Sequence, residues 1–357
     1  MATTRINQLK ARIRQDNLDA LVITYPNQIR YLTGFSGDTA VLVITPTQAE
    51  LMADFRFKDQ AHKQTKGAKV NVTKGDSFTG LKDHRLLCAK NARVGFSSEQ
   101  MSVGARERLA RHIPSALLVA ADSTLFGMGW VKDAAELKEI KKAVHIADVA
   151  FERVLALVRP GVGENELAAE LEYQMMMLGS EKPAFDSIIA SGYRSAMPHG
   201  VASLKKVQKG DFVTFDFGAT VNGFVSDCTR TVVVGKASER QKKIYNIVAK
   251  AQLAAIHKVR AGIEAKAIDA AARTVITKAG YGKEFGHGTG HGIGFYIHMG
   301  PRVSQVSQDK LMVNNVITIE PGIYITGWGG VRIEDDVVVT KSGCTVLNRA
   351  EKKLLEL

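Results

Sequence analysis

Cysteine is scarce in this sequence of 357 residues, which contains only Cys88, Cys228 and Cys344. So small and odd a set provides neither a disulfide framework nor a cysteine-based zinc motif, and it favours a reducing compartment. Long apolar runs are missing as well, because no stretch has the length of a signal peptide's apolar region or of a membrane-spanning helix. We therefore expect a cytoplasmic protein that does not act at a membrane.

Basic charge is in excess, but it is not concentrated. Lys and Arg number 48 against 36 Asp and Glu, which gives a formal net charge of +12. The densest basic runs, at residues 63–69, 205–209 and 240–243, are short and poor in aromatic side chains. Nucleic-acid binding usually gathers basic residues on one face, with aromatic side chains for stacking. We therefore predict a solvated basic surface and no nucleic-acid partner; a weak attraction for anionic partners is the alternative.

The sequence does contain two successive α/β patterns. Residues 1–125 alternate short apolar runs, typical of strands, with amphipathic segments such as the helix predicted over residues 5–18. Residues 122–130 lack periodicity and mark a domain boundary. The second domain, residues 126–357, has long helices predicted over residues 133–158, 164–178, 239–259 and 265–279, and strands over residues 184–191, 212–221, 224–234, 316–325 and 331–340.

Two carboxylates lie in the apolar segment 212–234. Asn222-Gly223 separates two β-rich runs there, which is the strongest short-range signal for a hairpin. A turn at these two residues pairs Asp216 with Thr229, and it places Asp216 and Asp227 on one sheet face as diagonal neighbours. If they are buried, two unpaired carboxylates are costly, and a cation bound between them removes the cost. From this segment alone, an exposed polar face of the hairpin is an equally good interpretation.

Glycine alternates with other residues in the segment 286–294, G-H-G-T-G-H-G-I-G, which makes a poor helix. His287 and His291 are therefore not a helical zinc pair; in an extended run they would lie on one side together. The segment fails the dinucleotide fingerprint G-x-G-x-x-G in every frame, which argues against a dehydrogenase. The glycines indicate close approach of the backbone to a ligand or to another strand. With His298 just beyond, a ligand or catalytic role is favoured over purely structural histidines.

Two more carboxylates interrupt apolar strands near the C-terminus. Glu320 ends the run V-I-T-I-E, and Glu334 lies in V-R-I-E-D-D, where the strand period places it on the same face as Arg332. A plain ion pair with Arg332 is the alternative interpretation of Glu334. Four carboxylates and one histidine would suit two divalent cations at the separation of about 3.5–4 Å that is typical of two-metal hydrolases. Such ligands favour Mn²⁺, Co²⁺ or Zn²⁺ over copper.

These residues resemble the motifs of the pita-bread metallopeptidases, which include methionine aminopeptidase, prolidase, aminopeptidase P and the metal-free creatinase. The matching motifs, in order, are F-D-F-G with Asp216, S-D-C-T-R-T with Asp227, G-H-G-I-G with His291, I-E-P-G with Glu320 and R-I-E-D-D with Glu334. The resemblance covers the whole chain and implies an α/β (α+β) fold. A creatinase-like α/β N-terminal domain would occupy residues 1–125, and it includes the run Y-L-T-G-F-S-G at 31–37. A pita-bread catalytic domain, with a curved antiparallel sheet covered by helices, would occupy residues 126–357.

The resemblance also implies a role for each ligand. Asp216 would hold one metal ion, His291 and Glu320 would hold the other, and Asp227 and Glu334 would bridge the two. Two divalent ions are implied, with Mn²⁺ the first candidate and Co²⁺ or Zn²⁺ the alternatives. Together they would activate a water molecule for attack on the peptide carbonyl. Glu320 would also carry a proton to the leaving nitrogen.

Further active-site residues follow from the same resemblance. His199 and His298 would stabilise the tetrahedral intermediate by hydrogen bonding. Arg332 would support the site, and His287 matches an additional active-site histidine. Met299 departs from the family pattern, since many members carry an acidic residue at this position.

The motif details favour aminopeptidase P within the family. The N-terminal domain and the form of the last motif argue against methionine aminopeptidase, and the complete ligand set argues against creatinase. The run S-G-Y-R-S-A-M-P-H-G at 191–200 resembles bacterial aminopeptidase P. We therefore predict a homodimeric Xaa-Pro aminopeptidase whose substrates are peptides with proline in the second position. An Xaa-Pro dipeptidase (prolidase) is the alternative, and a metal-free binding protein on the same fold is a remote one.

Overall fold

The computed structural model describes residues 2–357, with side chains from residue 4 onward. The chain divides into two compact units, Met1–Met128 and Gly129–Leu357. None of the helices within the described residues is long and apolar enough to cross a membrane.

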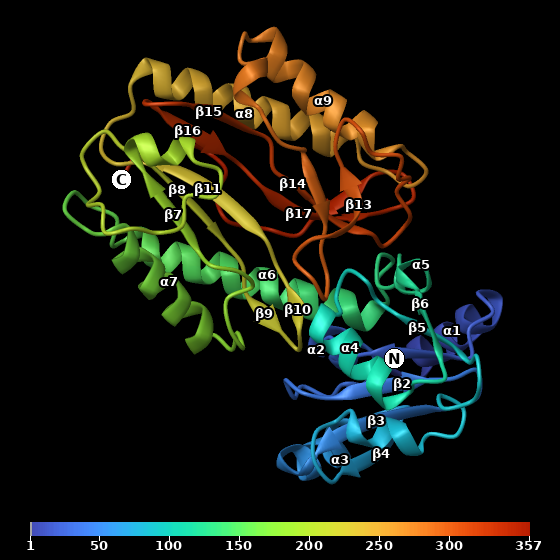
Figure 1. Ribbon diagram of the computed structural model, residues 1–357. Helices are drawn as coiled ribbons and strands as arrows, with labels where there is room; N and C mark the ends of the chain where they lie inside the picture. Colours follow the sequence, from blue (N-terminus) through green and yellow to red (C-terminus); the bar gives the residue numbers. More distant parts are fainter. Residues whose placement is uncertain (1) are drawn as a thin grey trace. The chain divides into compact units, whose positions relative to one another are not determined.

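A six-stranded mixed sheet forms the centre of the first unit (Figure 1). Its strands are β1 (Ala20–Ile23), β2 (Val41–Ile44), β3 (Ala49–Asp54), β4 (Lys69–Thr73), β5 (Arg93–Phe96) and β6 (Leu117–Ala120), in the order β4-β3-β2-β1-β5-β6. Its helices are α1 (Ala2–Gln15), α2 (Pro26–Thr33), α3 (Lys58–Gln64), α4 (Val103–His112) and α5 (Asp122–Leu125). The amphipathic helix predicted over residues 5–18 is present as α1, and its apolar side chains Ile6, Leu9 and Ile13 are buried.

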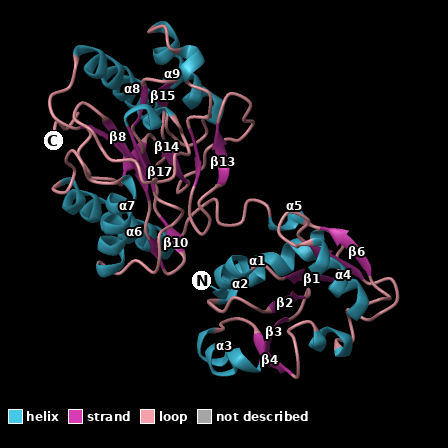
Figure 2. Cartoon of the chain, turned by 60° about the vertical axis from the view of Figure 1, so that its left-hand side comes forward, coloured by secondary structure: helices cyan, strands magenta, loops and turns pink. Residues whose placement is uncertain are grey.

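The second unit contains two groups of antiparallel strands, each associated with a pair of helices (Figure 2). In the first group, β7 (Ile188–Ser191), β8 (Phe212–Phe217) and β11 (Cys228–Val233) share a core with α6 (Ala134–Leu155) and α7 (Glu164–Met177). In the second, β12 (Gly290–Gly292), β13 (Met299–Val303), β14 (Val316–Ile319), β17 (Asp335–Val339) and β18 (Cys344–Val346) form a sheet, and β15 (Gly322–Ile325) pairs with β16 (Gly329–Arg332). The helices α8 (Glu239–Lys258) and α9 (Ala265–Lys278) complete this second core. The predicted α/β fold class is confirmed.

The predicted hairpin is present with the expected register. Asn222 and Gly223 both have left-handed backbone conformations, with φ of 49° and 81°, as a two-residue turn between antiparallel strands requires. This turn joins the short strands β9 (Thr220–Val221) and β10 (Phe224–Val225), and Asp216 on β8 pairs with Thr229 on β11. The turn chemistry therefore fixes which side chains of β8 and β11 share a face.

Four of the predicted strands are each divided in two. The segment 212–221 separates into β8 and β9, and the segment 224–234 separates into β10 and β11. The segment 316–325 separates into β14 and β15 at Glu320 and Pro321, because proline has no N–H to donate to a continuous ladder. The segment 331–340 separates into β16 and β17 at Ile333 and Glu334. The expectation that Arg332 and Glu334 follow the period of one uninterrupted strand is therefore wrong.

Aromatic packing holds α6 against the strand that carries Asp216. The Phe151 ring lies 5.4 Å from the ring centres of both Phe215 and Phe217, and its side chain is buried. Replacing such a residue by alanine removes buried apolar surface and leaves a cavity, which typically costs about 3–5 kcal/mol. We therefore expect Phe151→Ala to lower the free energy of unfolding of the second unit by about this amount.

Urea unfolding followed by circular dichroism measures this loss. The control is Tyr173→Ala on α7, whose side chain is 55% exposed, and a surface substitution of this kind usually changes stability by less than about 0.5 kcal/mol. Equal losses in the two variants would contradict the assignment of Phe151 to the core.

Candidate metal centre and active site

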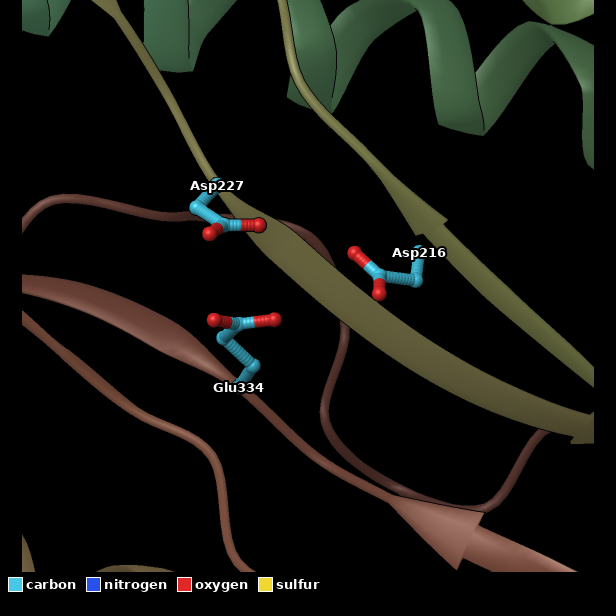
Figure 3. Close-up of side chains that lie close together, drawn as sticks. All are labelled: Asp216, Asp227 and Glu334. Carbon is cyan, nitrogen blue, oxygen red and sulfur yellow. The ribbon is translucent and has the colours of Figure 1, made fainter. Parts of the chain in front are cut away.

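Three carboxylates from separate segments converge in the second unit (Figure 3). Asp216 lies on β8, Asp227 lies between β10 and β11, and Glu334 lies between β16 and β17. One carboxylate oxygen from each lies within 4.8 Å of the others. Figure 3 shows the three groups pointing toward one another across the strands. The register of the hairpin brings Asp216 and Asp227 together, and Glu334 joins them from the break between β16 and β17.

Burial makes this group a candidate cation site. Asp227 and Glu334 are only 5% and 1% exposed. Oδ1 of Asp216 and Oε1 of Glu334 are buried without a hydrogen-bond partner among the described residues. A buried carboxylate oxygen without a partner is costly, and a bound divalent ion would satisfy both atoms. The side chains present therefore fit a metal ion.

The electrostatics of the three carboxylates agree with this interpretation. Burial and the neighbouring carboxylates Glu334 and Asp216 raise the pKa of Asp227 well above its usual value. Burial, together with Glu320 and Asp216, does the same to the pKa of Glu334. Burial also raises the pKa of Asp216, although Arg332 opposes the shift. Each group resists ionisation chiefly because it is buried, and Asp227 and Glu334 do so also because other carboxylates lie near; a cation between them would reverse that effect.

A histidine and a fourth carboxylate adjoin this group. The Nε2 atom of His291, on β12, lies 3.3 Å from Oε1 of Glu320 and 3.6 Å from Oδ2 of Asp227. The Thr318 hydroxyl contacts both residues, since it accepts the backbone N–H of His291 at 3.1 Å and donates to the Glu320 carboxylate at 3.2 Å. Burial raises the pKa of Glu320, but the hydrogen bond and charge of His291 outweigh it and bring the pKa to about 2. Glu320 is thus the carboxylate of the set that is ionised most readily.

Glycine allows His291 to reach this position. A Cβ atom on Gly290 would lie 2.0 Å from the Thr318 carbonyl oxygen, and one on Gly292 would lie 2.1 Å from the Gly300 carbonyl oxygen. Both contacts are with backbone atoms, which cannot move aside. The predicted close approach of the glycine-rich segment to neighbouring strands is confirmed.

The other predicted histidines occupy three different settings. His298 lies just before β13, and its ring centre is 4.5 Å from that of His291. His287 lies outside the strand that carries His291, so the expectation of one extended run carrying both is wrong. His199 is exposed and is among the charged groups that act on Asp216 and His298.

Arg332 connects the carboxylates to a tyrosine that the sequence did not single out. Its guanidinium donates to Oδ2 of Asp216 at 2.6 Å and to the Tyr324 hydroxyl at 2.9 Å. That hydroxyl lies 2.9 Å from Nε2 of His287, and burial raises the pKa of Tyr324 to about 12. Arg332 reaches Glu334 only through the Thr229 hydroxyl, which accepts from Arg332 Nε and donates to Glu334. Tyr324 could not be recognised because G-I-Y-I is typical of an ordinary strand.

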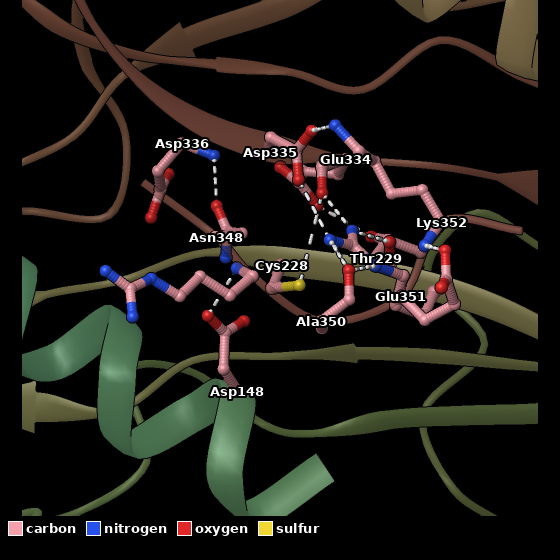
Figure 4. Close-up of polar contacts among 12 residues, drawn as sticks. Asp148, Cys228, Thr229, Glu334, Asp335, Asp336, Asn348, Ala350, Glu351 and Lys352 are labelled. Atoms are coloured by element: carbon pink, nitrogen blue, oxygen red, sulfur yellow. Dashed lines mark hydrogen bonds and ion pairs between the residues drawn. The ribbon is translucent and has the colours of Figure 1, made fainter. Parts of the chain in front are cut away.

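A buried ionic network supports the segment that bears Glu334, just before β17 (Figure 4). Arg230 pairs with Asp335 at 2.9 Å and also donates to the carbonyl oxygens of Thr229, Glu334 and Ala350. Lys352 donates to the second oxygen of Asp335 at 2.7 Å. The charged residues Arg230 and Asp335 stand out in the sequence because they lie in apolar strands, but the sequence does not identify their partners.

Comparison with known proteins agrees with this geometry. The family model described as metallopeptidase family M24 matches residues 138–341, and the creatinase/prolidase N-terminal domain matches residues 5–127. The Xaa-Pro dipeptidase of Pyrococcus horikoshii is 39% identical over 346 residues, covering 96% of this chain and 95% of that protein.

Solved structures also resemble this protein over the full length of the chain. An Xaa-Pro dipeptidase from Bacillus anthracis has a TM-score of 0.95 at 39% identity and covers all of both chains. An X-Pro aminopeptidase from Thermotoga maritima has a TM-score of 0.89 at 36% identity and covers 97% of this chain and all of that one. The resemblance inferred from the five motifs is confirmed: the chain belongs to metallopeptidase family M24 and carries a creatinase/prolidase N-terminal domain.

Proposed function

We propose that this protein is a metal-dependent Xaa-Pro dipeptidase. The observation that carries the proposal is the buried group of carboxylates with unsatisfied oxygens beside His291. Among the full-length relatives, those from P. horikoshii and B. anthracis are named Xaa-Pro dipeptidases. They favour the dipeptidase alternative over the aminopeptidase predicted from the run at 191–200. A homodimeric state and a cytoplasmic location stay predictions.

The proposed ligands of two divalent ions are Asp216, Asp227, His291, Glu320 and Glu334, with Mn²⁺ the first candidate metal. When bound, such ions polarise the substrate carbonyl and provide a nucleophilic water at neutral pH. A set of four carboxylates and one imidazole fits Mn²⁺, Co²⁺ and Zn²⁺.

The protein's own side chains then bind the substrate and move protons. Burial and the neighbouring His291 lower the pKa of His298, so at neutral pH its ring is uncharged and donates one N–H. Together with His199 it would donate to the carbonyl oxygen of the scissile bond as negative charge develops there. The Glu320 carboxylate would accept the proton that the attacking water gives up and pass it to the proline nitrogen as the peptide bond breaks. Arg332 would hold Asp216 in position.

Arg302 provides a physical reason for preferring dipeptides. It lies on β13, four residues after His298; it is exposed, and it is one of the charges that act on His298. The free carboxylate of an Xaa-Pro dipeptide follows directly after the proline ring. A guanidinium beside His298 can bind that carboxylate through paired hydrogen bonds, whereas a longer peptide has a neutral amide there.

The substrate prediction concerns peptide length. We expect kcat/KM for an Xaa-Pro dipeptide to exceed that for the matching Xaa-Pro-Xaa tripeptide by roughly 10-fold or more, because a hydrogen bond to a charged group contributes about 1.5–3 kcal/mol. Steady-state hydrolysis of Leu-Pro and Leu-Pro-Gly with Mn²⁺ measures this ratio. Arg302→Met should remove the preference, and Arg302→Lys should keep part of it. Equal or better cleavage of the tripeptide by the wild-type enzyme would identify an aminopeptidase.

A second prediction separates the ligand histidine from the donor histidine. His291→Ala should lose bound metal, because Nε2 of His291 lies among the carboxylate oxygens. His298→Ala should retain the metal but lower kcat by roughly 10²–10³, the usual effect of removing one oxyanion donor. Elemental analysis after dialysis, together with kcat, tests both variants. Metal loss in His298→Ala but not in His291→Ala would reverse the two roles.

A third prediction concerns pH and metal removal. The folded protein holds protons on Asp227 and Glu334 more tightly than an unfolded chain, whose carboxyl groups titrate near pH 4. Their contribution to stability is therefore complete below about pH 4 and is lost as pH rises through the raised pKa values. Ionised carboxylates are also the form that binds metal. We expect Mn²⁺ to raise the melting temperature more at pH 8 than at pH 5, measured by differential scanning calorimetry. A larger increase at pH 5 would contradict the proposed site.

A further inference from the structure

The loop that carries His199 is joined to helix α7 by a buried carboxylate, in addition to a backbone hydrogen bond from Asn165 to Ser203. We call residues 192–203 the His199 loop; it follows β7 and precedes β8. Glu164 is the first residue of α7, and its side chain is 0% exposed. It lies far from His199 in the sequence, and none of the motifs that identify the family contains it.

Both ends of the His199 loop bind the two oxygens of Glu164. Oε1 accepts hydrogen bonds from the backbone N–H and the hydroxyl of Ser191, at 2.7 and 2.8 Å. Oε2 accepts from the backbone N–H and the hydroxyl of Ser203, at 3.1 and 2.6 Å. It also pairs with Arg194 at 3.2 Å. One carboxylate therefore closes the base of the loop.

Further hydrogen bonds extend this support toward the active site. Arg194 crosses the loop and donates to the Val201 carbonyl at 2.8 Å. Next to His199, the Pro198 carbonyl accepts a hydrogen bond from Arg332 at 3.2 Å. The loop is thus held at its base by Glu164, at Ser195 by the Gly330 N–H, which donates to the serine hydroxyl at 2.8 Å, and near His199 by the arginine that also binds Asp216.

The loop contributes little apolar packing of its own. Tyr193, Met197 and Val201 are about half exposed, and the neighbouring Leu204 is 80% exposed. A surface segment with few buried apolar contacts opens readily unless other interactions order it. A hydrogen-bond donor to a reacting carbonyl must be positioned closely, and a shift of about 1 Å can cost roughly 10²-fold in rate.

We propose that Glu164 is a positioning residue that fixes His199 for catalysis by closing the base of its loop. The proposal rests on the role of His199 in the proposed function, because Glu164 itself touches neither substrate nor metal ligands. Its effect on turnover should therefore pass through His199.

Two isosteric substitutions in the first turn of α7 test this. Glu164→Gln keeps the side-chain shape but replaces one acceptor oxygen by an NH₂ group and leaves Arg194 without its partner charge. We expect kcat to fall roughly 10- to 100-fold, with KM and metal content little changed. Glu166→Gln is the matched control. Glu166 is half exposed, pairs with Lys206 and accepts the Gly163 N–H, and glutamine can replace it in that capping interaction.

A double-mutant cycle shows whether the effect passes through His199. In a His199→Ala background, Glu164→Gln should lower kcat by no more than about 2-fold, because coupled residues are not additive. If the decrease in kcat of the double variant equals the product of the decreases in the two single variants, Glu164 does not act through His199 and the proposal is wrong.

Hydrogen exchange on the full-length, metal-free protein provides a readout that is independent of activity. Glu164→Gln should speed exchange within residues 192–203 and leave the β8 and β11 amides protected. Unchanged exchange in the loop, or faster exchange throughout the second unit, would overturn the proposal.

If Glu164→Gln does not fold, Arg194→Met, a substitution within the loop, replaces it in the double-mutant cycle and in the exchange measurement. A wild-type protein that cleaves no Xaa-Pro peptide would refute the proposed function, and the exchange result would still decide whether Glu164 orders the loop.

Discussion

Mutual repulsion among buried carboxylates is the constraint on which the rest of this site depends. Charges repel far more strongly inside a protein than in water, and Asp227 and Glu334 are both buried beside other acidic groups. Arg332 offsets the charge of Asp216, and His291 offsets that of Glu320. His291 also lies 3.6 Å from Asp227, whereas Glu334 has no directly paired basic side chain among the described residues. The site therefore has the charge balance of a receptor for cations, and folding must hold it together against its own repulsion.

Rigid support from outside the carboxylate group meets that demand. Arg230 binds backbone carbonyls on both sides of the junction between β11 and β17, and Asp336 accepts the backbone N–H of Asp227 at 2.9 Å. The supporting groups bind the backbone of the proposed ligands and leave their carboxylate oxygens available. Glu164 follows the same principle at the His199 loop, where it binds the ends of the loop and not the histidine.

Local chemistry made part of this arrangement predictable. The Asn222-Gly223 turn permits one register, so the shared face of Asp216 and Asp227 followed from sequence. Long-range partners could not be found in this way: Tyr324 meets His287 across 37 residues, and Glu164 meets Ser203 across 39. The run at 191–200, which favoured the aminopeptidase prediction, builds the His199 loop. Arg302, which we propose binds a substrate carboxylate, lies on β13, outside that run.

The proposed ligands are divided between the two helix-associated halves of the second unit, and this affects how the protein is made. Asp216 and Asp227 belong to the first half, whereas His291, Glu320 and Glu334 belong to the second. Glu334 is supported in turn by contacts to Ala350 and Lys352 through Arg230 and Asp335. The chain must leave the ribosome through Lys352 before these ligands and their supports are all present. We therefore expect no peptide-bond hydrolysis by a nascent chain that ends before these residues.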